Sequence, residues 1–236
     1  MKGSDILTED LIKTDALVGR MSGDARRSQI LQVAIRLFSQ NGFSGTTTKE
    51  IAKMAGVSEA MVFRHFATKH ELYHAILDFK ACEGGTKNPP WENLIIKRAI
   101  AEKDDYAVFY NFALGALLNH KQDVDFMRLL FYSALDEHEL SQMFFDQFVS
   151  RIYEFIGSYV RQRQIEGIMR EEVEPRIVVR AFLGMLIHHS LNNILWDRKR
   201  RLLDVSDEEA AHEFVTILLN GVKKQLPAEA QKAQRK

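Results

Sequence analysis

The spacing of apolar residues restricts the fold of this chain more than any other feature. From Asp24 onward, apolar side chains recur at intervals of three and four residues almost everywhere, which is the period of a helix with one buried face. No convincing alternation of apolar and polar residues indicates a strand. Only four prolines interrupt the 236 residues, so long helices are sterically permitted. We therefore expect an all-α fold, whose core needs no disulfide or metal at this chain length.

The chain has one clear internal break. Residues 83–90 (EGGTKNPP) combine glycine, proline and asparagine, which disfavour regular structure. We expect a compact helical unit over residues 22–81 and a larger helical domain over residues 82–226. Residues 1–21 and 227–236 are polar and weakly patterned, so we interpret them as a flexible N-terminal arm and a flexible tail.

Capping signals place the helices of the first unit. Thr47 and Glu50 have the spacing of a capping box, and so do Thr68 and Glu71, so a helix is expected to begin near each threonine. Gly42 stands where the first helix needs a left-handed cap. The helices expected in this unit cover residues 24–41, 47–56, 58–67 and 68–81. Those expected in the second domain cover residues 104–120, 123–134, 141–166, 175–197 and 207–225.

Composition argues against several classes of protein. Lysine and arginine number 32, as do aspartate and glutamate, so the net charge does not itself predict a polyanionic partner. The single cysteine, Cys82, cannot form an intrachain disulfide, and residues 1–20 lack the apolar run of a signal peptide. No apolar stretch reaches the roughly 18 residues that span a bilayer. We expect a cytoplasmic protein that has no membrane contact and needs no metal or cofactor.

Three residues have the spacing of a helix-turn-helix motif. Ala52 is small where two helices must cross closely, Gly56 tolerates the positive φ of the turn, and Val62 wedges the second helix on the first. Ile51 and Val57 complete this small core. The pattern predicts two short helices at a fixed angle, with the outer face of the second helix exposed.

Residues 42–77 (GFSGTTTKEIAKMAGVSEAMVFRHFATKHELYHAIL) resemble the TetR family of repressors, and the recognisable motif covers about residues 24–80. The resemblance implies a three-helix DNA-binding domain followed by a larger helical domain for ligand binding and dimerisation. It implies a homodimer that binds a palindromic operator with two reading helices roughly 34–36 Å apart. A small molecule would release it. Repression is the default expectation, and activation is the alternative.

The resemblance assigns the DNA contacts to residues of the motif. Arg64 is the best candidate for reading a base edge, because a guanidinium can bond guanine through two donors. Phe63 stands where the family usually has a tyrosine, so the hydroxyl commonly used on phosphate is absent. For Glu59, a contact to a cytosine amino group and a role at the helix dipole are both open. Met61 could meet a thymine methyl or simply lie on the surface. The full set is Thr47, Thr48, Lys49, Ser58, Glu59, Ala60, Met61, Phe63, Arg64, His65 and Lys69.

The dimer and the ligand pocket are assigned to the second domain. In the family, the last two helices pack against their copies, here those over residues 175–197 and 207–225. Their apolar stripes are Val178, Phe182, Met185 and Leu186, then Phe214, Leu218 and Val222, with Gly184 and Gly221 as small residues. Aromatic residues are dense over residues 106–159, which favours an apolar or aromatic effector. The candidate lining residues are Phe112, Phe131, Phe148 and Tyr153. The helix over residues 68–81 joins the two domains and is the expected lever of the switch.

One enzyme signal competes with this interpretation. Residues 70–74 (HELYH) satisfy the H-E-x-x-H pattern, in which two histidines bind zinc and a glutamate acts as base. A helical zinc hydrolase that uses His70, Glu71 and His74 is therefore the alternative function, with Glu92 or Glu102 as a third ligand. For the acidic segment 136–139 (DEHE), a solvated helix junction is the favoured interpretation. For His188 and His189, burial in the core or at an interface is favoured.

Overall fold

The computed structural model describes residues 22–83 and 89–224. The expected N-terminal arm, the tail and residues 84–88 of the internal break lie outside the described residues. Every named element in the described part is a helix, as the sequence predicts. In chain order the elements are α2 (Gly23–Asn41), α3 (Thr48–Met54), α4 (Glu59–His65), α5 (Lys69–Glu83), α6 (Leu94–Ala101), α7 (Asp105–Gln122), α8 (Val124–Leu135), α9 (Glu139–Phe144), the π-helical turn η2 (Phe145–Val149), α10 (Ser150–Ile165), α11 (Pro175–Leu191), the π-helical turn η3 (Asn192–Trp196) and α12 (Asp207–Val222).

Capping side chains begin the helices of the N-terminal unit. The box predicted at α3 is complete, because the Glu50 N–H donates to the Thr47 hydroxyl (3.2 Å) and the Thr47 N–H donates to the Glu50 carboxylate (2.8 Å). At α5 the Glu71 N–H donates to the Thr68 hydroxyl (3.0 Å), but the Glu71 carboxylate accepts from the Ala67 N–H (2.8 Å) instead of from Thr68. Glu71 is therefore a capping residue, one position out of register with the predicted box.

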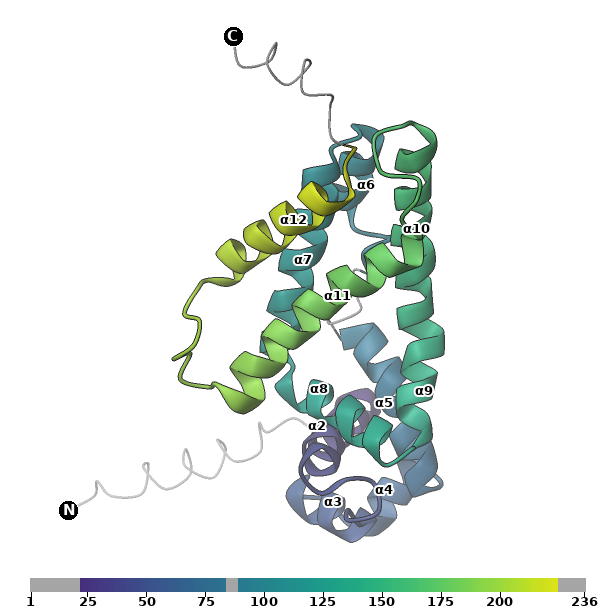
Figure 1. Ribbon diagram of the computed structural model, residues 1–236. Helices are drawn as coiled ribbons and strands as arrows, with labels where there is room; N and C mark the ends of the chain where they lie inside the picture. Colours follow the sequence, from purple (N-terminus) through teal and green to yellow (C-terminus); the bar gives the residue numbers. More distant parts are fainter. Residues whose placement is uncertain (1–21, 84–88, 225–236) are drawn as a thin grey trace, which may run out of the picture.

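The core of the N-terminal unit continues into the second domain. Phe38 of α2, Val62 of α4 and other buried residues of the unit form one cluster with Leu129 of α8 and Leu140 of α9. Figure 1 shows α2, α3 and α4 at one end of an elongated molecule, with α8 above α2. The described N-terminal unit is therefore not an independent body, because burial of shared apolar surface holds it against α8 and α9.

The second domain has its own core, formed chiefly by α6, α7, α10, α11 and α12. Phe109 of α7 and Phe182 of α11 are fully buried, with ring centroids 5.2 Å apart in an edge-to-face arrangement. Near this core, the buried Asp105 carboxylate accepts hydrogen bonds from the Tyr159 hydroxyl (2.7 Å) and from Nε of Arg163 (2.7 Å). This ionic cluster ties the first turn of α7 to α10.

The structure corrects the predicted helices of the second domain in three places. Helix α6 was not expected, although Asn93 caps it by accepting from two backbone amides. The single helix predicted over residues 141–166 begins earlier, at Glu139, and is interrupted by η2. The helix predicted over 175–197 ends in η3. A π-helical turn adds one residue to a helical turn without glycine or proline, so a periodicity argument does not detect it.

The apolar stripes predicted for the dimer interface pack mainly inside the chain. Five of these residues are buried in the second core: Val178, Phe182, Leu186, Leu218 and Val222. They therefore contribute to the stability of the domain and are not available to a partner. None of the helices in the described ranges is both long and apolar enough to cross a membrane.

Candidate nucleic-acid interface and cavity

Helices α3 and α4 meet through the small residues that the sequence predicts. Gly56, between them, has φ +65°, a value that a side chain disfavours. The Val57 N–H donates to the Ala52 carbonyl (3.0 Å), which closes the turn. Ala52 is 4% exposed and Val62 is 1% exposed, so the two helices pack directly on each other. The predicted helix-turn-helix geometry is confirmed at these residues.

The outer face of α4 carries solvent-accessible side chains. None of the residues predicted to contact DNA is buried, and Phe63, a large aromatic residue, is 45% exposed. Arg64 lies in the last turn of α4 and is exposed. Among the described residues, no hydrogen bond or ion pair involves its guanidinium, so its donors are available to an external acceptor.

Five of the predicted DNA contacts already have partners within the chain: Thr47, Thr48, Ser58, Glu59 and Lys69. The Thr47 hydroxyl takes part in the α3 capping box, and the Thr48 hydroxyl donates to the Glu59 carboxylate (2.6 Å). The Lys69 ammonium lies 4.1 Å from the centroid of the Phe43 ring. Burial lowers the pKa of Lys69, an effect that the charge of Glu50 opposes. In this structure, Glu59 therefore links α4 to α3.

A cavity of about 470 Å³ lies between α5 and the helices of the second domain, with walls from α5, α6, α7, α8, α9, η2, α10 and α11. Phe112, Phe131 and Phe148 line it, whereas Tyr153 does not; the Tyr153 hydroxyl accepts from Nε of Arg180 (3.3 Å). The polar residues of the wall include Lys80, Asn111, Asn119, His120 and Asp123. Most of the exposed lining is nevertheless apolar, as is usual for small-molecule sites.

The charged groups in the cavity wall balance each other. The Lys80 ammonium lies 2.6 Å from the Asp123 carboxylate, which joins α5 to the start of α8. Burial lowers the pKa of the neighbouring His120 to about 4, so its imidazole is neutral at pH 7. It is bonded to the Ser190 hydroxyl (2.9 Å). Sequence reasoning did not select Lys80 or His120, because nothing in their local pattern distinguishes a cavity wall from a solvated helix face.

The HELYH segment does not form the predicted catalytic arrangement. Glu71 is engaged as a cap, and Glu102 pairs with Arg98. The carboxylate beside the two histidines is instead that of Glu139, which lies 3.1 Å from Nδ1 of His70 and 2.6 Å from Nε2 of His74. A base held in a backbone hydrogen bond does not face a metal-bound water, so this geometry does not support the hydrolase.

The family model for bacterial regulatory proteins of the tetR family matches residues 30–76, which contain the α3–α4 pair and most of α5. The matched part of the chain is thus similar to the DNA-binding unit of TetR-family regulators. The AcrR and NalD proteins described below, which are similar to this chain, are named as regulators too. This similarity is a second argument against the hydrolase alternative.

Curated relatives match either a short part of the chain at high identity or most of it at lower identity. The HTH-type transcriptional regulator AcrR of Shigella flexneri is 50% identical over 50 residues, which are 21% of this chain and 23% of AcrR. The match thus spans about a quarter of that relative. The nucleoid occlusion factor SlmA of Vibrio campbellii is 29% identical over 173 residues, which are 72% of this chain and 84% of SlmA.

Solved structures share the fold over most of the chain. NalD, the secondary repressor of the MexAB-OprM multidrug efflux pump in Pseudomonas aeruginosa, has a TM-score of 0.62 and 22% identity, covering 86% of this chain and 98% of that one. AibR, in complex with isovaleryl coenzyme A and operator DNA, has a TM-score of 0.59 and 20% identity, covering 82% and 98%. At these identities the likeness extends the family fold to the second domain.

Proposed function

We propose that this protein is a homodimeric repressor of the TetR family that binds a palindromic operator through α4 and is released by a neutral, largely apolar small molecule. The observation that carries the proposal is the outer face of α4, where the exposed Arg64 has no ionic or hydrogen-bonding partner among the described residues. Of the similar proteins, NalD is named a repressor, and AibR was solved with both a ligand and operator DNA.

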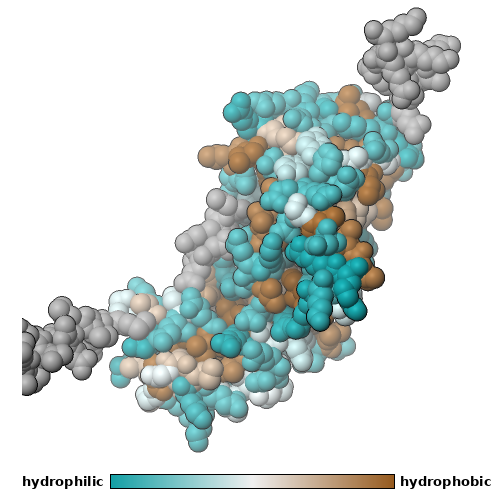
Figure 2. All heavy atoms as spheres, turned by 90° about the vertical axis from the view of Figure 1, so that its left-hand side faces the viewer, coloured by the Kyte–Doolittle hydropathy of each residue, from teal (hydrophilic) through white to brown (hydrophobic). Residues whose placement is uncertain are grey.

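The outward faces of α11 and α12 support dimerisation. With the predicted stripes buried, the residues left on these faces include Ile177 and Ile217, which are 57% and 60% exposed. Gly184 and Gly221 lie on the same faces, and a Cβ added at either would meet no atom within 4 Å. The chain's own packing does not require these glycines, whereas close approach by helices of a second copy would. Hydrophobic side chains are also exposed among hydrophilic ones on the side of the molecule shown in Figure 2.

The cavity supports an uncharged effector. Its aromatic walls suit an apolar or aromatic group, and its polar residues can orient a few heteroatoms. The Lys80–Asp123 pair leaves no surplus charge from those two residues, and His120 is neutral. Burying an uncompensated charge there would cost several kcal/mol, roughly, so a neutral molecule is favoured over an ion.

Helix α5 connects the cavity to the DNA-binding unit. Lys80, near its C-terminal end, lies in the cavity wall, while Leu72 and Ile76 are buried in the core shared with α3 and α4. A ligand that displaces the Lys80–Asp123 pair would shift α5 and, through the shared core, the DNA-binding helices α3 and α4. Such a ligand releases DNA only if it binds the non-binding conformation more tightly.

The operator is best sought in the DNA upstream of the protein's own gene, because regulators of this kind often control neighbouring genes. Purified protein should retain a short palindromic duplex from that region, with two chains per duplex and an affinity that falls steeply with salt. Binding of a single chain per duplex, or equally strong retention of random duplexes, would refute the proposal that a homodimer binds a specific operator.

The effector site is tested separately with a library of neutral aromatic and aliphatic compounds. Compounds that raise the melting temperature of the chain should lower its operator affinity, and Ala116→Trp, which fills the cavity, should abolish both effects. As a matched control, Ala101→Trp on the exposed surface of α6, outside the cavity lining and outside α11 and α12, should preserve the thermal shift. A compound whose effects survive Ala116→Trp would place the effector site elsewhere.

A further inference from the structure

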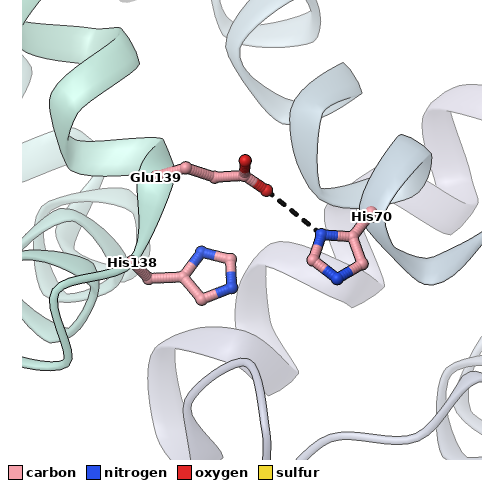
Figure 3. Close-up of side chains that lie close together, drawn as sticks. All are labelled: His70, His138 and Glu139. Carbon is pink, nitrogen blue, oxygen red and sulfur yellow. Dashed lines mark hydrogen bonds and ion pairs between the residues drawn. The ribbon is translucent and has the colours of Figure 1, made fainter.

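A compact cluster of metal-ligating groups lies where α5 meets α9, outside both the reading surface and the cavity. His70 and His74 are one helical turn apart on α5, and His138 and Glu139 stand at the N-terminus of α9. Ligand atoms of His70, His138 and Glu139 all lie within 4.8 Å of one another. Figure 3 shows the His70 and His138 rings on either side of the space that the Glu139 carboxylate enters, with the His70–Glu139 contact dashed.

One nitrogen of this cluster lacks the partner that a buried polar atom normally has. Nδ1 of His138 is shielded from solvent and makes no hydrogen bond to a described residue. Nε2 of His74 is also shielded, and it contacts the Glu139 carboxylate at 2.6 Å. A buried nitrogen without a partner destabilises the fold. A ligand that accepts the lone pair of Nδ1 of His138 would remove that cost.

Packing fixes the positions of these side chains. The His138 N–H donates to the Ser133 carbonyl (2.7 Å), and the Ser133 hydroxyl donates to the His138 carbonyl (2.9 Å), which holds the α8–α9 turn. The Phe43 ring lies 4.7 Å from His70 and 4.3 Å from His138, measured between ring centroids. Leu140, next to Glu139, is fully buried. The rings are thus held before any ligand arrives, which lowers the entropy lost on binding.

We propose that His70, His138 and Glu139 form a binding site for a divalent transition-metal ion, with His74 as the fourth ligand. Imidazole nitrogens with one carboxylate are ligands that suit Zn²⁺. A tetrahedral site with bonds of about 2.1 Å has ligand atoms about 3.4 Å apart, so His70, His138 and Glu139, whose ligand atoms lie within 4.8 Å of one another, need only side-chain adjustments. Four protein ligands leave no open position for a water, which makes the site structural.

This inference departs from the sequence-based expectation that the chain needs no metal, and it does not depend on the proposed function. The HELYH pattern contains two of the ligands, but the carboxylate comes from the DEHE segment, about 70 residues away in the chain. Helices α3 and α4 pack on α5 in a shared core. A bound ion would therefore link α5 directly to α9.

The test is a Zn²⁺ titration of the full chain after removal of metal with a chelator, followed by calorimetry and repeated with Co²⁺ to obtain an absorption spectrum. One ion per chain should bind, with a tetrahedral Co²⁺ spectrum, and should raise the melting temperature. His70→Gln and Glu139→Gln should each weaken Zn²⁺ binding at least about tenfold. His188→Gln changes an exposed histidine outside the cluster and should leave the affinity within about twofold.

Matching circular dichroism of the metal-free variants establishes that the fold is kept. Wild-type protein that fails to bind Zn²⁺ below about 100 μM would overturn the proposal. Binding that survives both His70→Gln and Glu139→Gln would overturn it as well, because the ion would then lie elsewhere.

Discussion

The Asp105–Arg163 cluster offers a quantitative test of how the second domain is held together. The Asp105 side chain is 3% exposed and that of Arg163 is 9% exposed, so both charges are withdrawn from water. Burial alone would raise the pKa of Asp105, but hydrogen bonds from Arg163 and Tyr159 outweigh it and lower that pKa. Asp105→Asn keeps the shape and removes the charge.

The expected cost follows from what remains around Arg163. Removing one partner of a buried pair typically costs about 3–5 kcal/mol. Arg163 retains Glu166, whose side chain is 21% exposed, and Lys223 is exposed enough to regain hydration, so we expect the lower end, about 3 kcal/mol. For a chain of this size, that free energy corresponds to a fall in melting temperature of roughly 6–12 °C.

The assay is thermal unfolding followed by circular dichroism at pH 7. Asp204→Asn is the matched control, because the Asp204 carboxylate is 79% exposed and lies 3.8 Å from Arg200. That change should shift the melting temperature by less than about 2 °C. If Asp105→Asn shifted it no more than the control does, the buried ionic cluster would not be a stabilising feature of the domain.

Other predictions concern the cavity, the turn and the reading helix. Because burial lowers the pKa of His120 to about 4, its neutral form stabilises the fold fully above pH 6.5 and loses this contribution as the pH falls towards 4. Between pH 7 and pH 5, the free energy of unfolding in urea should fall by about 2 kcal/mol more for wild type than for His120→Gln. Equal falls would contradict the lowered pKa of His120. Gly56→Ala should lower the free energy of unfolding by about 1–2 kcal/mol, because φ is +65° and the added Cβ has open space, so backbone strain is the only cost. Gly23→Ala at the start of α2 should leave that free energy nearly unchanged. Equal stabilities of the two variants in urea unfolding would contradict the strain at Gly56. Phe63→Tyr adds a hydroxyl on an exposed face and should tighten operator binding roughly 2- to 10-fold in a fluorescence anisotropy titration, whereas unchanged binding would mean that the ring does not approach phosphate.

The N-terminal unit could be predicted well because its signals are local. Thr47 with Glu50, Ser58, and Gly56 each fix a helix start or a turn within a few residues, and the structure has them as expected. The exposed position of Arg64 follows from the burial of Val62 two residues earlier on a short helix.

The second domain could be predicted only in outline, because its functional geometry depends on long-range contacts. The Lys80–Asp123 pair joins two helices that lie on opposite sides of the 83–90 break in the sequence. Glu139 contacts His70 although the two residues are far apart in the chain. An amphipathic stripe also does not reveal what covers it, so Phe182 and Leu218 could not be assigned to the chain's own core or to a partner from the sequence. The π-helical turns leave no composition signal.

The most direct test of the account measures the specificity ratio of α4. Operator and random duplex are titrated against wild type, Arg64→Ala and Arg198→Ala, the last being an exposed arginine outside the predicted DNA contacts. Arg64→Ala should lose about 1–3 kcal/mol on the operator, roughly 5- to 150-fold, and much less on random duplex, while Arg198→Ala should match wild type. Equal loss on both duplexes, or no loss, would contradict sequence reading by Arg64.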